Sequence, residues 1–442
     1  MTGVAAPVVF RPVGPLRGRV RVPGDKSVTQ RALLIGAVCD GPVTVEGPVW
    51  AGDPLATAGM VADLGVRVAG LDERAPVAVV HGAGLRGLRP PGRPLDARNS
   101  GTGMRLLAGL LAGQRGRFTV DGDATLRVRP MSRVVEPLRA MGVRIDAREG
   151  RFAPLVIEGG EVLPVRYEPP VASAQVKSCV LLAGLFAANG GETVVVEPTP
   201  TRDHTERLLA AAGVPVRRAG REVGVTGVDG LSLDRVRVPG DPSSSAFLVA
   251  AALLVPGSSI EIDGVGLNPT RLGFYEVARR MGGDVTWEVT DDSGPEPVGV
   301  LRAVASALRG VNTAAAETAP MIDEVTLVAL LASFAEGETV LEGVAELRAK
   351  ESDRLQAVVE ILGALGAAAE ASGDTLRVRG SSGAAGRSPR GGAVDSRGDH
   401  RLALLGAVAG LACPNGVRIA GFDSSEVSFP GFTSTLAEVL SP

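Results

Sequence analysis

The stretch Pro23-Gly24-Asp25-Lys26-Ser27 recurs 216 residues later as Pro239-Gly240-Asp241-Pro242-Ser243, and an apolar segment follows each copy. A polar residue placed directly before an apolar segment is typical of a helix N-terminus. The repeated motif therefore predicts a duplicated chain, in which each half opens with an equivalent apolar helix.

Within the two halves, an apolar helix pattern rich in Ala and Leu occurs six times at intervals of 70 to 80 residues. The six helices are predicted to begin near Ser27, Ser100, Ser173, Ser243, Asp323 and Asp399. A short alternating segment follows each and is predicted to be a strand: Val43–Glu46, Phe118–Asp121, Thr193–Glu197, Ser259–Asp263, Thr339–Glu342 and Val417–Ala420. In the first five repeats a second helix then ends at a glycine, as helices often do: Gly65, Gly142, Gly213, Gly282 and Gly366. Solenoid repeats span only about 20–45 residues, so this longer period argues against a solenoid and favours mixed strand-and-helix units.

The sixth repeat is predicted to be cut short after its strand. The N-terminal segment Arg17–Val22 has strand character, and we expect it to complete that repeat. Both termini would then lie in one domain. The sequence therefore predicts a first domain of residues 1–21 and 241–442 and a second domain of residues 22–240.

Composition restricts the class of protein. The chain has 442 residues, 45% of them hydrophobic, so it has ample material for buried cores and is not intrinsically disordered. Its net charge is −3, whereas a nucleic-acid-binding protein usually carries an excess of basic residues.

The cysteines and the apolar runs bear on location. Cys39, Cys179 and Cys413 lie far apart in apolar runs, which favours buried thiols over disulfides or a zinc site. The N-terminus does not resemble a signal peptide, and the longest apolar runs fall short of the roughly 20 residues that span a bilayer. We expect a soluble cytoplasmic protein, a monomer without a membrane or nucleic-acid partner.

Candidate anion-binding residues gather at helix starts in the first half. Backbone N–H groups at the start of a helix, with Lys26 and the Ser27 hydroxyl, suit a phosphate or carboxylate, and Arg31 lies one turn further on the same face. A helix cap formed by Asp or Ser explains the same residues without a ligand. The P-loop pattern is absent. Further polar segments precede or open predicted helices at Asn99–Arg105, Arg127–Met131, Ser173–Lys177 and Thr201–His204.

The second half carries three comparable segments. Asp323-Glu324 begins an apolar helix, where acidic residues also suit the helix dipole. Lys350 and Arg354 are four residues apart and would repel each other on one helix face unless an anion joined them. The segment Ser396–Arg401 opens the last apolar helix, and His400 there fits a capping or core histidine equally well.

These polar segments share one place in the repeat, at the N-terminal ends of helices or in the loops before them. Helix N-termini carry partial positive charge. If the helices of each half are roughly parallel, each half presents an electropositive face. A cleft between two such faces would hold a strongly anionic pair of substrates.

Seven motifs together resemble the 5-enolpyruvylshikimate-3-phosphate synthase family, in order from about residue 10 to the C-terminus. They are Pro23-Gly24-Asp25-Lys26-Ser27 with Arg31-Ala32-Leu33, Asn99-Ser100-Gly101-Thr102, Arg129-Pro130-Met131, Ser173-Ala174-Gln175-Val176-Lys177-Ser178, Arg202-Asp203-His204-Thr205-Glu206-Arg207, Lys350-Glu351-Ser352-Asp353-Arg354-Leu355 and Asp399-His400-Arg401. The resemblance implies an α/β (α+β) fold of two domains, each of three βαβαββ units arranged as an inside-out α/β barrel. It also implies transfer of the enolpyruvyl group of phosphoenolpyruvate to the 5-hydroxyl of shikimate 3-phosphate, with release of phosphate. Neither a metal nor a redox cofactor is expected.

The resemblance assigns roles to matching positions. It implies that Lys26 contacts both substrates and serves in proton transfer, that Asp323 lies near the attacking hydroxyl, and that Glu351 protonates the enol methylene. Binders of shikimate 3-phosphate are expected at Lys26, Ser27, Arg31, Ser173, Ala174, Gln175, Thr201, Asp323 and Lys350. Binders of phosphoenolpyruvate are expected at Lys26, Gly101, Arg129, Gln175, Arg354 and Arg401.

Two positions bear on the phosphoenolpyruvate site. Some members of the family carry a lysine before Thr-Phe-Pro near the C-terminus, whereas Val427 stands at that place here, before Ser428-Phe429-Pro430. The change removes one expected phosphate contact. Gly101 is typical of members that glyphosate inhibits, and alanine there is associated with tolerance, so we expect a glyphosate-sensitive enzyme.

Three other functions remain open from the sequence. UDP-N-acetylglucosamine enolpyruvyl transferases share the fold and the donor, but usually carry a cysteine on a mobile loop of the first half, and residues 113–132 contain none. A paralogue that acts on another cyclic alcohol in secondary metabolism is a second alternative. A binding protein without catalytic activity is the third, and the presence of Lys26, Asp323 and Glu351 argues against it.

Overall fold

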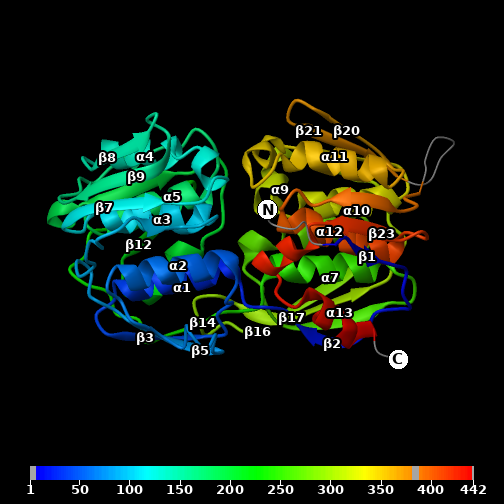
Figure 1. Cartoon of the computed structure of the whole chain (residues 1–442), viewed down its shortest axis with the longest axis horizontal. Helices are drawn as coiled ribbons and strands as arrows, with labels where there is room; N and C mark the ends of the chain where they lie inside the picture. The colour runs from blue at the N-terminus through cyan, green and yellow to red at the C-terminus, as the bar shows by residue number, and fades with distance from the viewer. Residues whose placement is uncertain (1–5, 381–387, 441–442) are drawn as a thin grey trace. The chain divides into compact units, whose positions relative to one another are not determined.

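The structure, a computed structural model, describes residues 6–380 and 388–440 and divides into two compact units (Figure 1). Unit 1 comprises the N-terminal residues as far as Pro23, the segment Gly240–Asp291 and the chain from Pro297 onward. Unit 2 comprises Gly24–Pro239, together with the short segment Asp292–Glu296. The chain therefore passes between the units inside each copy of the repeated motif, directly after Pro23 and directly after Pro239.

The six apolar helices predicted from the repeat are confirmed, and each begins within two residues of the predicted position. They are α1 (Lys26–Ala37), α3 (Gly101–Ala112), α5 (Ala174–Gly184), α7 (Pro242–Leu254), α10 (Val325–Phe334) and α12 (His400–Ala412). In α7 every residue from Pro242 to Leu253 is buried, which is expected of a helix that is apolar on all sides. Figure 1 shows α3 and α5 side by side in unit 2.

The second helices of the first five repeats are also confirmed. They are α2 (Gly52–Asp63), α4 (Ser132–Ala140), α6 (His204–Ala211), α8 (Gly273–Arg280) and α11 (Arg354–Ala364). The glycines predicted to end them, Gly65, Gly142, Gly213, Gly282 and Gly366, have φ between 82° and 91°. This left-handed conformation is costly for residues with a Cβ atom, so glycine ends each helix cleanly.

Each repeat of unit 2 contributes one four-stranded sheet. The strand that follows the apolar helix lies inside the sheet, parallel to one neighbour and antiparallel to the other. The strand orders are β14 (Arg235–Arg237), β3 (Pro42–Glu46), β5 (Val77–His81), β4 (Val68–Ala69); β6 (Leu95–Asp96), β7 (Gly116–Asp121), β9 (Phe152–Gly159), β8 (Arg144–Arg148); and β10 (Arg166–Tyr167), β11 (Glu192–Val196), β13 (Glu222–Thr226), β12 (Val216–Ala219).

Unit 1 repeats this arrangement with two four-stranded sheets and one of three strands. The four-stranded orders are β2 (Arg17–Arg21), β15 (Ser259–Gly266), β17 (Val298–Val304), β16 (Asp284–Asp291); and β18 (Asn312–Thr313), β19 (Glu338–Glu342), β21 (Thr375–Arg379), β20 (Ala368–Ser372). The third sheet has the order β1 (Val8–Phe10), β23 (Val417–Ala420), β22 (Gly392–Asp395). A single turn of helix, α9 (Ala315–Thr318), precedes α10.

The N-terminal prediction was wrong in detail. The segment predicted to complete the sixth repeat forms β2, which instead pairs in parallel with β15 of the fourth repeat. Arg19 of β2 forms ion pairs with Glu261 and Asp263 of β15, so charge complementarity favours this partner. The sixth sheet is completed by β1, which lies antiparallel to β23 (Figure 1). Phe10 of β1 packs its ring 4.9 Å from that of Phe422, which anchors the strand there.

The sixth repeat is also not cut short after its strand, contrary to the prediction. Helix α13 (Phe432–Leu440) follows β23, and its Phe432 is buried against Phe10 and Phe429. Among the residues that the structure describes, α13 is not followed by the paired strands that follow the second helix in the other repeats, which is why the periodic pattern did not extend to it. Both ends of the described chain therefore contribute to the core of unit 1.

Each unit has its own continuous hydrophobic core, formed by the apolar helices and the inward faces of its three sheets. Val, Leu and Ala dominate both cores, as the 3% aromatic content predicts. No helix in the described residues is long and apolar enough to cross a membrane.

The three cysteines are buried free thiols, as the sequence predicts. Burial raises the pKa of each thiol to about 12, and for Cys39 the neighbouring Asp40 adds to the shift. Because the thiolate is the reactive form, we expect iodoacetamide at pH 8 to label none of them in the folded protein and all three in denaturant. Mass spectrometry of the intact protein measures the outcome, and rapid labelling of the folded protein would contradict the assigned burial.

Candidate active site

The N-terminal turns of the three apolar helices meet in unit 2. Helices α1, α3 and α5 are joined there by side chains from their first two turns or cap positions. Three hydrogen bonds make the connections: Ser100 to Gln30 (2.9 Å), Gln175 to Thr102 (2.8 Å) and Arg31 to Ser178 (3.1 Å). Polar side chains up to 147 positions apart in sequence therefore connect the three helix starts, and the predicted site residues Arg31 and Gln175 are among them.

Arg31 is the most deeply held cation of this cluster. Its guanidinium donates to the Thr205 hydroxyl (2.8 Å), to the Ser178 hydroxyl and to the Ser27 carbonyl (3.1 Å). Burial lowers the pKa of Arg31 to about 10, and the nearby Glu206 carboxylate opposes that shift. Arg31 therefore stays protonated near neutral pH and presents a fixed positive charge next to Ser27.

Lys26 and Ser27 open helix α1, where two of the first backbone N–H groups, those of Ser27 and Val28, are already occupied. The Asp25 carboxylate caps the helix and accepts from the N–H groups of Ser27 (2.7 Å) and Val28 (2.9 Å). The Lys26 ammonium lies 3.0 Å from the Asp53 carboxylate of α2. An anion at this helix start therefore finds fewer backbone donors than the sequence predicts, which favours binding through side chains.

The same is true of most of the six apolar helices. Side-chain caps accept from first-turn N–H groups at α1, α3, α5, α7 and α12, through Asp25, Ser100, Ser173, Asp241 and Asp399. Each cap accepts from only one or two of the first-turn N–H groups, so the helix starts offer fewer free backbone donors than expected without losing all of them. Because three of these caps are carboxylates that offset the helix dipole, lysine and arginine side chains supply the positive charge.

A second group in unit 2 surrounds Gly101. Arg105, one turn further along α3, donates to the Gln175 side chain (2.7 Å) and to the Gly101 carbonyl (3.3 Å). Arg129 is anchored by Asn99, whose side-chain oxygen accepts from it at 2.8 Å. A Cβ atom at position 101 would lie 2.7 Å from an Arg105 nitrogen and 3.3 Å from an Arg129 nitrogen. Glycine there leaves room for two guanidinium groups, so three of the predicted phosphoenolpyruvate residues do come together.

Thr201 lies next to a buried charge network. Its hydroxyl and its N–H both donate to Glu197, whose carboxylate is 3.0 Å from the Lys177 ammonium. Lys177 also pairs with Glu206 at 2.8 Å, and its side chain is only 1% exposed. The network fixes the loop before α6. Ser173 and Ala174, the cap and first residue of α5, complete the predicted positions of unit 2.

In unit 1, the five predicted residues form one cluster centred on Asp323. The Asp323 carboxylate lies 3.4 Å from Lys350, 3.4 Å from Arg354 and 3.7 Å from Arg401. Glu351 accepts a hydrogen bond from Arg354 at 2.6 Å. Residues at or just before the starts of helices α10, α11 and α12 therefore lie close together, although they are up to 78 positions apart in the sequence.

Arg354 and Asp399 form the most deeply buried ion pair next to the Asp323 cluster. Arg354 donates to both Asp399 oxygens, at 2.8 and 3.2 Å, and both side chains are at most 1% exposed. Burial alone would lower the pKa of Arg354, but the carboxylates of Asp399, Glu351 and Asp323 outweigh it and raise that pKa. Burial opposes ionisation of Asp399 in the same way, yet the Arg354 charge holds its pKa below the ordinary 3.8. Both groups are charged at neutral pH.

The helical argument for Lys350 and Arg354 was wrong. Helix α11 begins only at Arg354, and Lys350 has extended backbone at the end of a short 3₁₀ turn, so the two do not share a helix face. Asp323 bridges them instead. The anion that the two like charges require is supplied by the protein itself.

Residues without an assigned role in the sequence analysis also take part. The sequence predicts Asp399 only as a helix start and as part of a motif, and it is indeed the cap of α12. Arg105 lies four residues after Gly101, a spacing that does place both on one helix face. Their partners are remote in sequence, so no local pattern could indicate the pairing.

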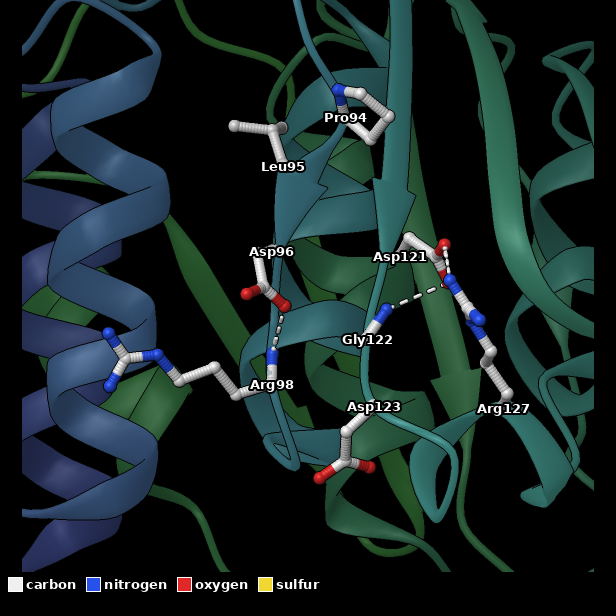
Figure 2. A pocket seen from close by; sticks show the side chains of 8 residues that line it. All are labelled: Pro94, Leu95, Asp96, Arg98, Asp121, Gly122, Asp123 and Arg127. Atoms are coloured by element: carbon white, nitrogen blue, oxygen red, sulfur yellow. Dashed lines mark hydrogen bonds and ion pairs between the residues drawn. The ribbon is translucent and has the colours of Figure 1, made fainter.

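A separate pocket of about 340 Å³ in unit 2 includes Arg127 of the candidate segment Arg127–Met131, but none of the residues expected to bind substrate. Its lining is Pro94, Leu95, Asp96, Arg98, Asp121, Gly122, Asp123 and Arg127. Figure 2 shows Arg127 directed at Asp121, with which it pairs at 2.9 Å, and Arg98 extending away from the aspartates. The hydrogen bond from Arg127 holds the pKa of Asp121 below its ordinary range. With three carboxylates and its nearest arginine engaged, this pocket does not suit anionic substrates.

Comparison with known proteins shows the family to which the chain belongs. The model of the family described as EPSP synthase (3-phosphoshikimate 1-carboxyvinyltransferase) matches residues 10–436. The 3-phosphoshikimate 1-carboxyvinyltransferase of Thermus thermophilus is 49% identical, over 96% of this chain and 97% of that protein. The one from Methylococcus capsulatus is 47% identical, over 96% of each chain.

Comparison with solved structures supports the same family. EPSP synthase from Acinetobacter baumannii superposes with a TM-score of 0.85 at 38% identity, covering 98% of this chain and 97% of that one. The enolpyruvyl transferase NikO from Streptomyces tendae gives a TM-score of 0.78 at 18% identity over the same shares of the chains, a likeness of fold alone. This chain belongs to the EPSP synthase (3-phosphoshikimate 1-carboxyvinyltransferase) family.

Proposed function

We propose that this chain performs the reaction of its family, transfer of the enolpyruvyl group of phosphoenolpyruvate to the 5-hydroxyl of shikimate 3-phosphate. Inorganic phosphate is released, and the product serves chorismate and aromatic amino acid biosynthesis in the shikimate pathway. Both substrates carry phosphate, and both carry a carboxylate. Such groups are bound by arginine forks and by lysine point charges, the side chains that the two clusters provide.

Unit 2 supplies mainly binding groups in this proposal. Lys26, Ser27, Arg31 and Thr201 bind shikimate 3-phosphate, and Ser173, Ala174 and Gln175 at the start of α5 complete its contacts. Gly101 and Arg129 bind phosphoenolpyruvate. The buried Arg31 beside Ser27, which stays protonated at neutral pH, supports a phosphate subsite there.

Unit 1 supplies the groups for proton transfer. Addition of an alcohol across the enol double bond requires removal of the hydroxyl proton and protonation of the methylene carbon. Asp323 acts at the 5-hydroxyl, Glu351 protonates the methylene carbon, and Lys26 of unit 2 assists. Lys350, Arg354 and Arg401 bind substrate anions. The observation that carries the proposal is the contact of one carboxylate, Asp323, with all three of these cations.

The wider setting is proposed on the same basis. The proposed domains are residues 1–21 with 241–442, and residues 22–240, and the two compact units differ from these bounds by one or two residues at each copy of the motif and by the segment 292–296. The protein is a cytoplasmic monomer whose partners are these two small anions. With a net charge of −3, it attracts them through local side chains rather than through its overall field.

An assay of phosphate release tests the reaction against its alternatives. We expect release from phosphoenolpyruvate in the presence of shikimate 3-phosphate, and none with UDP-N-acetylglucosamine as the acceptor. Release only with the nucleotide sugar would indicate the other transferase. Absence of release with both would favour a paralogue or a binding protein.

Replacement of Gly101 by alanine tests the phosphoenolpyruvate subsite. The added methyl group presses on the ends of Arg105 and Arg129, which can shift, so the variant should fold. Overpacking costs about 1–3 kcal/mol, equivalent to roughly 5- to 150-fold in affinity. We expect glyphosate to inhibit the wild type and the variant to be less sensitive, with a raised KM for phosphoenolpyruvate. Steady-state kinetics with and without millimolar glyphosate measure both, and an uninhibited wild type would contradict the prediction.

A further inference from the structure

The second copy of the repeated motif has no role in the proposed function, yet its serine occupies a distinctive place. In the first copy, Ser27 is followed four residues later by Arg31, and its hydroxyl makes no hydrogen bond to residues that the structure describes. In the second copy, the corresponding residues are Ser243 and the buried Phe247. The second copy therefore lacks an arginine of its own beside the serine.

Two arginines from elsewhere in unit 1 reach Ser243 instead. Its hydroxyl accepts from Arg271 at 2.8 Å and from Arg401 at 3.2 Å, and donates to the Glu324 carboxylate. A serine hydroxyl has one donor and two acceptor positions, so these three bonds use its full capacity. Ser243 therefore has no donor to offer a substrate, unlike its counterpart Ser27.

Arg401 is fixed from two further directions. One of its terminal nitrogens donates to Glu324 at 3.1 Å and to the Asp323 carbonyl at 3.0 Å. With the bond to Ser243, three of its five N–H donors are used by the described part of the protein. The other two N–H donors of Arg401 remain for an anion, and the Arg401 side chain is 8% exposed. The orientation of those two donors depends on Ser243 and Glu324.

We propose that Ser243 and Glu324 are positioning residues that orient Arg401 for phosphoenolpyruvate. Glu324 holds the guanidinium by charge and hydrogen bond. Ser243 sets its rotation and joins it to Arg271, which also pairs with the helix cap Asp241 at 3.3 Å. The inference rests on the proposed role of Arg401, and it gives the second copy of the motif a task distinct from that of the first.

The test compares Ser243→Ala and Glu324→Gln with wild type, alone and in an Arg401→Gln background. Misplacement of a binding group by about 1 Å can cost around 100-fold. We expect each single variant to lower kcat/KM for phosphoenolpyruvate by about 10- to 100-fold, while the Kd of shikimate 3-phosphate measured by calorimetry stays within about 2-fold. Because both residues act through Arg401, neither should cause a further loss in the Arg401→Gln background.

Ser245→Ala is the matched control. Ser245 is a buried serine of the same helix, bonded to Tyr275 and to the Pro242 carbonyl rather than to an arginine. Its loss should lower thermal stability without changing KM for phosphoenolpyruvate. If Ser243→Ala does not fold, the isosteric Glu324→Gln carries the same comparison.

Two results would overturn the inference. One is an unchanged kcat/KM for phosphoenolpyruvate in Ser243→Ala and Glu324→Gln. The other is a loss that persists in full when Arg401 is already replaced. Failure of the proposed function is distinguishable, since in that case the wild type itself releases no phosphate with shikimate 3-phosphate.

Discussion

Replacement of Glu351 by glutamine is expected to lower kcat by about 100- to 10 000-fold, the usual contribution of a general acid. Glutamine keeps the shape of the side chain and can still accept the hydrogen bond that Glu351 receives from Arg354. The surrounding cations should stay in place, so the Kd values of both substrates should change little. Rapid-quench single-turnover kinetics, with binding measured separately by calorimetry, distinguish the chemical step from binding.

The matched control for this variant is Glu360→Gln. Glu360 lies on the exposed face of α11 and pairs with Arg397, away from the Asp323 cluster. Its replacement should leave turnover unchanged. Normal turnover of Glu351→Gln would remove Glu351 from the mechanism, whereas equal losses in both variants would indicate a nonspecific effect on α11.

The largest effect on stability is expected from replacement of Asp399 by asparagine. Asparagine can still cap α12 by accepting from the Arg401 N–H, but it removes the buried carboxylate that accepts from Arg354 through both of its oxygens. Loss of one partner from a buried pair costs about 3–5 kcal/mol, and because Arg354 keeps its contacts with Glu351 and Asp323, we expect a loss at the lower end of that range. Asp399→Ala should cost about 1 kcal/mol more, since it also removes the cap.

Each unit contains one tryptophan, so its unfolding can be followed separately. Trp287 lies in β16 of unit 1 and Trp50 in unit 2. In a Trp50→Phe background, fluorescence during urea unfolding reports on unit 1, where the loss should appear. If Asp399→Asn changes the free energy of unfolding of unit 1 by less than about 1 kcal/mol relative to the Trp50→Phe protein, the result would contradict the role assigned to the Arg354–Asp399 pair.

The same pair predicts a pH dependence. Because the folded-state pKa of Asp399 lies below its ordinary 3.8, its ionised form stabilises the fold at all pH values above about 4. That contribution is lost as the pH falls through the lowered pKa. Stability of the wild type should therefore decline more steeply below pH 4 than that of Asp399→Asn, as urea titrations at several pH values would measure.

The repeat pattern was a reliable guide because it is local. Apolar helices, the strands after them and the glycines that end the second helices depend on residues a few positions apart. The N-terminal strands were assigned less well, since the choice between β15 and β23 as a partner depends on Glu261, Asp263 and Phe422. None of these is near the N-terminus in sequence, and both candidate segments have strand character.

The sequence by itself determined the six repeats, their grouping into halves and, through its motifs, the family and the residues expected to act. Only the tertiary structure decided how those residues are used. Asp25 and Asp399 occupy helix N-termini that an anion was expected to use, Asp323 joins Lys350 to Arg354, and Ser243 binds two arginines. The reason is physical: a buried charge must find a partner when water is removed, and the partner is whichever group the fold brings within about 3 Å, irrespective of its distance along the chain.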